Sequence, residues 1–178
     1  MAIEKTTFGG GCFWCLEAIF TKFNGIKSVV SGYEGGATID PTYEEICTGQ
    51  SGHAEVVQIE FDTDIISFRM LLDIFFTIHD PTTLNRQGND VGTQYRSVIF
   101  YHSQEQKECS ELAIKELDIS KQWSDPIVTE LKQCEKFYPA EGYHQDYFQN
   151  NPNNSYCNYV IPPKLDKIMK KYKGESLI

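Results

Sequence analysis

Three glycines that lead into two closely spaced cysteines constrain this chain more than any other feature of its sequence. Gly9–Gly11 precede Cys12, and two aromatic residues separate Cys12 from Cys15. Apolar residues continue at helical spacing, so the sequence predicts an amphipathic helix from about Cys12 to Phe23. Cys12 would stand at the start of this helix, where backbone N–H groups lack partners and the helix dipole is positive. This position favours the thiolate form and predicts a nucleophilic cysteine.

Three other roles are compatible with the cysteine pair. A lone cysteine on a helix is usually a small core residue, although the glycines before Cys12 argue against a buried site. Cys12 and Cys15 also have the spacing of a thiol–disulfide redox pair. They could supply two zinc ligands, but the other four cysteines form no second close pair and the four histidines are scattered.

Composition narrows the class of protein. The chain has 178 residues, 40% hydrophobic and 23% charged, which predicts one globular domain over 1–178. No apolar run approaches the ~20 residues that a membrane span needs, and the first residues lack the pattern of a signal peptide. We therefore expect a cytoplasmic protein whose six cysteines are mostly reduced. A net charge of −9 argues against a nucleic-acid partner, and nothing in the sequence requires more than a monomer.

The order of the predicted elements defines a fold class. Strands are predicted at 5–8, 26–33, 54–61 and 96–101. Helices are predicted at 12–23 and 67–78, the second capped by Ser67. Strand, helix, strand, strand, helix, strand is the order of the split βαβ, ferredoxin-like arrangement. We therefore predict an α+β two-layer sandwich with extended loops.

Further elements are predicted after the second helix. Residues 80–94 form a long polar loop, and long loops in compact domains are often functional. Ser103 and Gln106 have the spacing of a capping box and predict a helix that ends near Trp123. A short strand is expected at 126–131.

The C-terminal part is predicted to be less regular. Residues 139–149 are expected to form a short helix that carries His144 and Tyr147. Residues 150–178 are expected to form an irregular tail in which Pro163 starts a basic terminal helix.

Glu55 is the second anomaly in the sequence. Residues 54–61 alternate, so Val57 and Ile59 share one apolar face, and Glu55 falls on that face by period two. Burial would favour the neutral carboxyl and raise its pKa, which suits a general acid near neutral pH. If the alternation fails at the strand end, Glu55 faces water instead.

Other candidate groups have ordinary structural roles as well. Tyr33 and Tyr95 lie beside glycine-rich or polar loops, where their hydroxyls could hold a substrate oxygen, although most of the ten tyrosines should be packing residues. Asp90 in a turn is more often a local backbone cap. His144 and Tyr147 on one helical turn are more often packing or surface residues.

Six ordered segments of this chain are similar to those of the peptide methionine sulfoxide reductase A family, which reduces the S epimer of the sulfoxide. The resemblance covers the chain from Phe8 to about Lys164. The similar segments are Gly11–Trp14, Ser31–Gly36, Gly52–Val57, His79–Thr82, Asp90–Ser97 and Tyr143–Tyr147.

The resemblance implies a mechanism for protein repair under oxidative stress. Cys12 would attack the sulfoxide sulfur and become a sulfenic acid. Glu55 would protonate the sulfoxide oxygen, and Tyr33 and Tyr95 would hydrogen-bond it. The implied pocket residues are Phe13 and Trp14, which hold the substrate methyl group, with Asp90, His144 and Tyr147 lining or supporting them. The substrates would be oxidised proteins and free methionine sulfoxide, with no metal and no bound organic cofactor.

The resemblance also implies a recycling step. A second thiol would form a disulfide with Cys12, which thioredoxin, or dithiothreitol in vitro, would reduce. Many family members carry two cysteines in a glycine-rich tail, whereas this tail contains only Cys157. Other members have a cysteine at the position of Cys15, one helical turn from Cys12. We predict Cys157, after a mobile segment, as the resolving thiol and keep Cys15 as the alternative.

Overall fold

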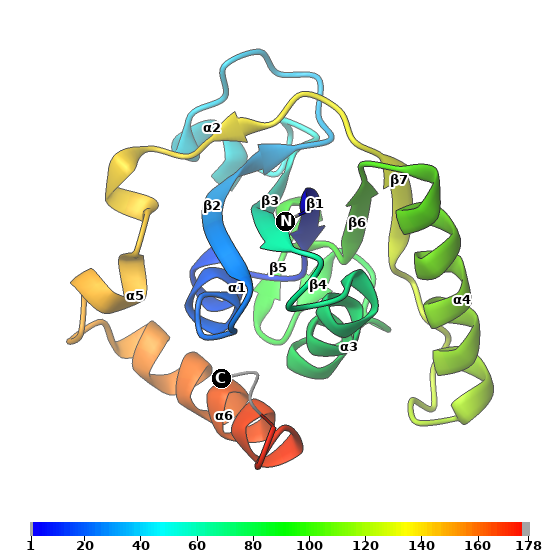
Figure 1. Ribbon diagram of the computed structural model, residues 1–178. Coiled ribbons are helices and arrows are strands. Elements are labelled where there is room, and N and C mark those ends of the chain that lie inside the picture. The colour runs from blue at the N-terminus through cyan, green and yellow to red at the C-terminus, as the bar shows by residue number, and fades with distance from the viewer. Residues whose placement is uncertain (1, 176–178) are drawn as a thin grey trace.

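A six-stranded sheet lies at the centre of the computed structural model, which describes residues 2–175 (Figure 1). The strands follow the order β7-β6-β1-β3-β2-β8 across the sheet. Their bounds are β1 Ile3–Gly9, β2 Ile26–Glu34, β3 Ala54–Asp62, β6 Val98–Tyr101, β7 Glu130–Gln133 and β8 Tyr138–Pro139. β7 runs parallel to β6, and the other neighbouring pairs are antiparallel. The predicted strand at 126–131 therefore lies several residues later, at Glu130–Gln133.

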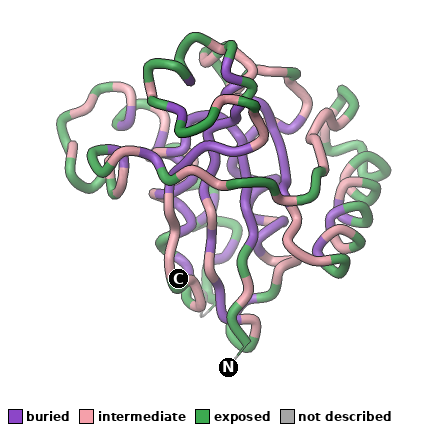
Figure 2. Tube along the Cα trace, turned by 90° about the horizontal axis from the view of Figure 1, so that it is seen from above, coloured by how far each residue is buried: buried purple, intermediate pink, exposed green. Residues whose placement is uncertain are grey.

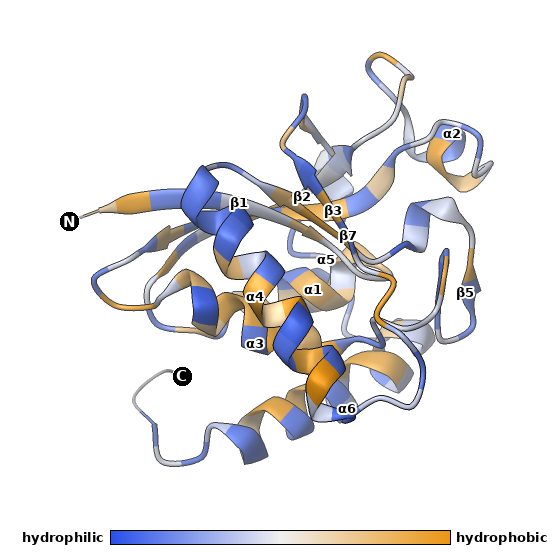
Figure 3. Ribbon diagram, turned by 90° about the vertical axis from the view of Figure 1, so that its right-hand side faces the viewer, coloured by the Kyte–Doolittle hydropathy of each residue, from blue (hydrophilic) through white to orange (hydrophobic). Residues whose placement is uncertain are grey.

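The longer helices lie on the same side of this sheet (Figure 3). They are α1 Phe13–Phe20, α3 Phe68–Ile78, α4 Gln104–Ser120 and α6 Ser155–Lys171. The shorter elements are α2 Tyr43–Cys47, α5 Tyr147–Asn150, the 3₁₀ turns η1 Thr93–Tyr95 and η2 Gly142–His144, and the hairpin strands β4 Arg86–Gln87 and β5 Asp90–Val91. Among residues 2–175, none of the helices is both long and apolar enough to cross a bilayer.

The main core lies between the sheet and helices α1 and α3, where the trace is almost entirely buried (Figure 2). Phe8 of β1 stacks on Phe75 of α3 with ring centroids 4.7 Å apart, and Phe20 of α1 lies 5.7 Å from Phe8. A smaller apolar cluster on the opposite face contains Val56 and Phe100. Because both faces of β3 are covered at its first residues, a side chain there is buried on either side.

Local capping signals set the starts of α3 and α4. Ser67 accepts a hydrogen bond from the backbone N–H of Met70, and Ser103 accepts one from Gln106, as predicted. Helix α4 ends at Ser120 rather than near Trp123, because the next residue, Lys121, adopts the left-handed conformation with φ 57°.

The predicted single helix at 139–149 is wrong. Two short helical turns, η2 and α5, occupy this region, separated by Gln145 in an extended conformation and Asp146 with φ 52°. The side chain of Gln145 bonds to the backbone of Ser31, from which it accepts at 3.0 Å and to which it donates at 2.9 Å. These tertiary hydrogen bonds replace the local ones that a continuous helix would have made.

The predicted irregular tail is also wrong. Helix α6 begins at Ser155, eight residues before Pro163, and contains both Pro162 and Pro163. Asn154 starts it by accepting a hydrogen bond from the backbone N–H of Cys157 at 2.9 Å. Cys157 is therefore part of an ordered helix that packs against α1 and α3, not of a mobile segment.

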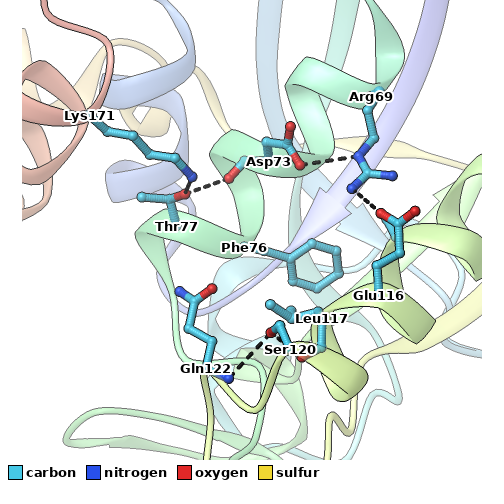
Figure 4. A pocket seen from close by; sticks show the side chains of 10 residues that line it. Arg69, Asp73, Phe76, Thr77, Glu116, Leu117, Ser120, Gln122 and Lys171 are labelled. Atoms are coloured by element: carbon cyan, nitrogen blue, oxygen red, sulfur yellow. Dashed lines mark hydrogen bonds and ion pairs between the residues drawn. The ribbon is translucent and has the colours of Figure 1, made fainter.

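The C-terminal end of α6 is held by a hydrogen bond beside a cavity of about 240 Å³ between α3, α4 and α6 (Figure 4). Lys171 donates to the hydroxyl of Thr77 at 2.8 Å. Across the cavity, Arg69 pairs with Asp73 at 3.2 Å and with Glu116 at 2.6 Å. These contacts join all three helices.

Replacing Asn154 with Ala is expected to lower the free energy of unfolding by about 1 kcal/mol, because the substitution removes the cap of α6. The neighbouring Asn153 is exposed and provides the matched control, Asn153→Ala. Urea unfolding of both variants measures the difference. Equal stability of the two variants would contradict the capping role.

Candidate active site

Two glycines bring Cys12 from the end of β1 to the start of α1. A Cβ atom on Gly10 would lie 3.0 Å from the ring of Phe75, and one on Gly11 would lie 2.7 Å from the side chain of Gln87. Gly11 also has φ +91°, a conformation that favours glycine. Cys12 is the N-cap residue of α1, as predicted, and is 9% exposed.

The environment of Cys12 does not favour the thiolate in the way that the helix start alone predicts. Burial raises the pKa of the Cys12 thiol well above its ordinary value, and a hydrogen bond to Cys15 and the nearby Glu55 raise it further. Cys12 does lie at a helix start, which favours the thiolate, but the loss of solvent on burial has the larger effect on its pKa and favours the neutral thiol. Cys12 is therefore a neutral thiol before substrate arrives.

Glu55 lies inside the protein, as its place in the alternating strand predicts. It is 2% exposed, pairs in register with Tyr33 of β2, and accepts a hydrogen bond from the backbone N–H of Phe13 at 3.3 Å. Burial raises its pKa to about 8, against the lowering effect of the Phe13 hydrogen bond. A neutral carboxylic acid thus lies against the first turn of the helix that Cys12 caps.

The two aromatic residues after Cys12 differ in exposure. Phe13 is fully buried and packs against Tyr33 and His144 at 5.7 and 5.2 Å between ring centroids. Trp14 is half-buried and stacks on Tyr147 at 3.7 Å with 7° between the rings. Its indole N–H donates to Nδ1 of His144 at 3.1 Å. The structure therefore gathers these predicted pocket residues around α1.

The two predicted oxygen-binding tyrosines also differ. Tyr33 is fully buried, and its hydroxyl donates to Glu141 at 3.0 Å. Tyr95 is half-buried in η1, and burial followed by the charges of Glu55 and Asp90 raises the pKa of its hydroxyl. Of these two tyrosines, Tyr95 is the one whose hydroxyl has no partner among the hydrogen bonds of residues 2–175.

Helix α6 closes the other side of Cys12. The hydroxyl of Tyr156 donates to the carboxylate of Asp90, and its ring meets Trp14 edge-on at 6.4 Å. A cavity of about 340 Å³ lies here, lined in part by Cys12, Asp90, Tyr156 and Tyr159. Asp90 is therefore more than a local turn cap.

Sequence reasoning missed three residues of this site. Tyr43 lies 4.3 Å from His144 between ring centroids, and Glu141 accepts hydrogen bonds from both Tyr33 and the backbone N–H of Tyr43. Tyr156 is the third, and its position beside Cys157 was the one available signal. Tyr43 and Glu141 lie in segments without a clear period, so nothing local marked them.

Three of the buried residues near the site are cysteines, Cys12, Cys15 and Cys157. Cys15 is 1% exposed, and its hydrogen bond to Cys12 lowers its pKa. Cys157 is fully buried, and burial followed by the nearby Cys15 raises its pKa to about 11. Cys15 is therefore a neighbour of Cys12 and also acts on the pKa of Cys157. Within residues 2–175, no three His, Cys, Asp or Glu side chains are grouped to hold a metal ion, so the zinc alternative gains no support.

This arrangement is that of a thiol-dependent oxidoreductase. A thiol can take up an oxygen atom from an oxidised substrate when a nearby acid protonates that oxygen, and a second thiol can then remove it as water. Cys12 lies beside both Cys15 and Glu55 in this site.

The chain belongs to the peptide methionine sulfoxide reductase family, whose sequence model matches residues 4–177. It is 57% identical over 172 residues to peptide methionine sulfoxide reductase MsrA of Polynucleobacter asymbioticus, an alignment that covers 97% of this chain and 90% of the relative. Its structure is similar to that of reduced Mxr1 from Saccharomyces cerevisiae, with a TM-score of 0.79, 36% identity and 90% of each chain covered. Mxr1 in complex with Trx2 matches with a TM-score of 0.55 and 28% identity over 82% of this chain and 84% of that one.

Proposed function

We propose that this chain reduces methionine-S-sulfoxide, free or in proteins, to methionine, with Cys12 as the nucleophile and Glu55 as the proton donor. The observation that carries this proposal is the neutral, buried carboxyl of Glu55 against the helix start that Cys12 caps. A sulfoxide oxygen leaves poorly unless it is protonated, so the reaction needs such an acid.

The proposed step transfers the sulfoxide oxygen to Cys12 and moves two protons. The sulfur of Cys12 attacks the sulfoxide sulfur while Glu55 gives its proton to the oxygen, and the thiol proton of Cys12 returns to the Glu55 carboxylate. The attack joins the two sulfur atoms. The hydroxyl group then moves from the substrate sulfur to the sulfur of Cys12 as the sulfur–sulfur bond breaks. The substrate sulfur keeps that electron pair, so it gains two electrons and leaves as methionine, and Cys12 loses two electrons and becomes a sulfenic acid. Because the Cys12 thiol and the Glu55 carboxyl are both neutral before the step, the net charge of the buried site does not change.

The substrate would be held by the residues around α1. The exposed part of Trp14, backed by Tyr147 and His144, is the proposed wall for the methyl group, and buried Phe13 supports it from behind. We assign the hydrogen bond to the sulfoxide oxygen to Tyr95. Tyr33 acts through Glu141, and Asp90 together with Tyr156 lines the opposite side.

Recycling is proposed to pass from Cys12 through Cys15 to Cys157. The sulfenic acid of Cys12 condenses with Cys15 and releases water, and Cys157 then attacks Cys15 and frees Cys12. Cys157 thus remains the thiol that completes resolution, with Cys15 as the relay. Thioredoxin is the proposed reductant, since the relative Mxr1 has been solved in complex with Trx2. Dithiothreitol would replace it in vitro.

We also propose that residues 1–178 form one catalytic domain of a cytoplasmic monomer, in which 150–178 carry the resolving cysteine. The strand order β6-β1-β3-β2, with α1 and α3 as the intervening helices, supports a ferredoxin-like split βαβ core.

A single turnover of the reduced protein without added reductant tests the function. Each epimer of a blocked methionine sulfoxide is supplied separately, and methionine and remaining thiols are measured. We expect product from the S epimer alone, with a loss of thiols. Absence of product from both epimers would overturn the proposal, and disulfide reductase activity that needs Cys15 but not Glu55 would favour a general thiol–disulfide oxidoreductase.

A further inference from the structure

Glu17 is a buried carboxylate that the proposed reaction does not use. It lies on α1 one helical turn after Trp14 and is 3% exposed. The hydroxyl of Ser31 donates to it at 2.8 Å. Burial raises its pKa, while hydrogen bonds from Ser31 and from the backbone of Asp146 and Tyr147 oppose that shift. Donors from two distant segments therefore converge on one carboxylate.

The segment that Glu17 holds is the turn between two short helical elements, η2 and α5. Asp146 has φ 52°, a left-handed conformation that a non-glycine residue keeps only when its surroundings enforce it. Gln145 fixes the same segment through Ser31 and through the carbonyl of Ala140 at 3.2 Å. Glu17 and Gln145 thus fasten this turn to α1 and β2.

The same turn orients Trp14. Its indole N–H donates to His144, just before Gln145, and its ring stacks on Tyr147, just after Asp146. Helix α5, which begins with Tyr147, lies beside α1 (Figure 1). A shift of the turn would therefore move both groups that hold the indole.

We propose that Glu17 is a positioning residue that sets the orientation of Trp14 through residues 144–147, and with it the apolar wall that receives the sulfoxide methyl group. The inference rests on the proposed function, because that function gives Trp14 its role. It assigns Glu17 no contact with substrate.

The test compares Glu17→Ala and Glu17→Gln in a Trp123→Phe background, so that fluorescence reports on Trp14 alone. In the alanine variant we expect the KM for the S-sulfoxide to rise about tenfold with kcat changed by less than about twofold, because binding common to ground and transition state is lost. The emission of Trp14 should shift before substrate is added. Gln can still accept one N–H and donate to Ser31, so it should restore most of both signals. Glu111→Ala, on the exposed face of α4, is the control.

A folded Glu17→Ala variant with unchanged emission and unchanged KM would overturn the inference. If that variant does not fold, Ser31→Ala removes one donor and must shift both readouts in the same direction, or the inference fails. The emission is measured without substrate. A wild-type protein that reduces no sulfoxide would therefore refute the proposed function, while the emission would still decide whether Glu17 orients Trp14.

Discussion

Replacing Glu55 with Gln is expected to slow methionine formation in a single turnover by roughly 10²–10⁴-fold, the usual contribution of a positioned general acid. The amide has the size of the carboxyl and can still accept the hydrogen bond from Phe13, but it has no acidic proton to give. Rapid quenching and quantification of methionine measure the rate. Glu60→Gln, on the same strand but at a half-exposed position paired with Lys5, is the matched control.

The pH dependence gives the same prediction an independent readout. Glu55 must be protonated to act, and its pKa is about 8. The wild-type rate should therefore hold from pH 6 to near 8 and fall as the pH rises through that value, while the Glu55→Gln rate should lack this fall. A Glu55→Gln variant with the full rate and the same profile would show that another group, such as Tyr95, donates the proton.

Replacing Cys157 with Ser is expected to leave the first turnover intact and to halt thioredoxin-driven cycling after about one methionine per protein. The sulfenic acid of Cys12 would still condense with Cys15, but no Cys157 thiol would remain to attack that disulfide and free Cys12. Cys157 is itself fully buried in the first turn of α6, so the expected block comes from the loss of its thiol and not from a difference in exposure. Coupled turnover with thioredoxin and peptide mapping of the disulfides measure the two stages.

Two further variants decide the order of the relay. Cys15→Ser should leave the sulfenic acid of Cys12 trapped for reaction with dimedone, whereas direct Cys12–Cys157 pairing in this variant would remove Cys15 from the path. Cys109→Ser, on α4, is the control and should cycle normally. Full cycling of Cys157→Ser would refute the role of Cys157.

Local signals in the sequence predicted the elements that local chemistry controls. The alternation placed Glu55 on the apolar face of its strand but left open whether the strand end is covered, and the structure shows that Glu55 is buried. The caps at Ser67 and Ser103 correctly predicted the starts of two helices. The glycines correctly placed Cys12 at a helix start. Each of these features depends on neighbours in the sequence, so a single chain was enough to find it.

The errors arose where distant residues decide the outcome. The helix at 139–149 was predicted from its own sequence, but Gln145 bonds to Ser31, 114 positions away. The thiolate of Cys12 was predicted from the helix start alone, whereas burial by the folded chain controls its pKa. Residues 150–178 were predicted as an irregular tail, although Asn154 caps a regular helix, α6. Pro163 was predicted to start a terminal helix, but it lies inside α6.

The neutral thiol of Cys12 should resist oxidation by general oxidants. Peroxides and alkylating agents react with exposed thiolates, so a buried, protonated cysteine is a poor target for both. In the proposed mechanism, Cys12 becomes a strong nucleophile only when a bound sulfoxide accepts the proton of Glu55 and leaves a carboxylate to take the proton of the thiol. The Cys12 thiol would thus react poorly with general oxidants under the conditions in which oxidised methionine is most abundant.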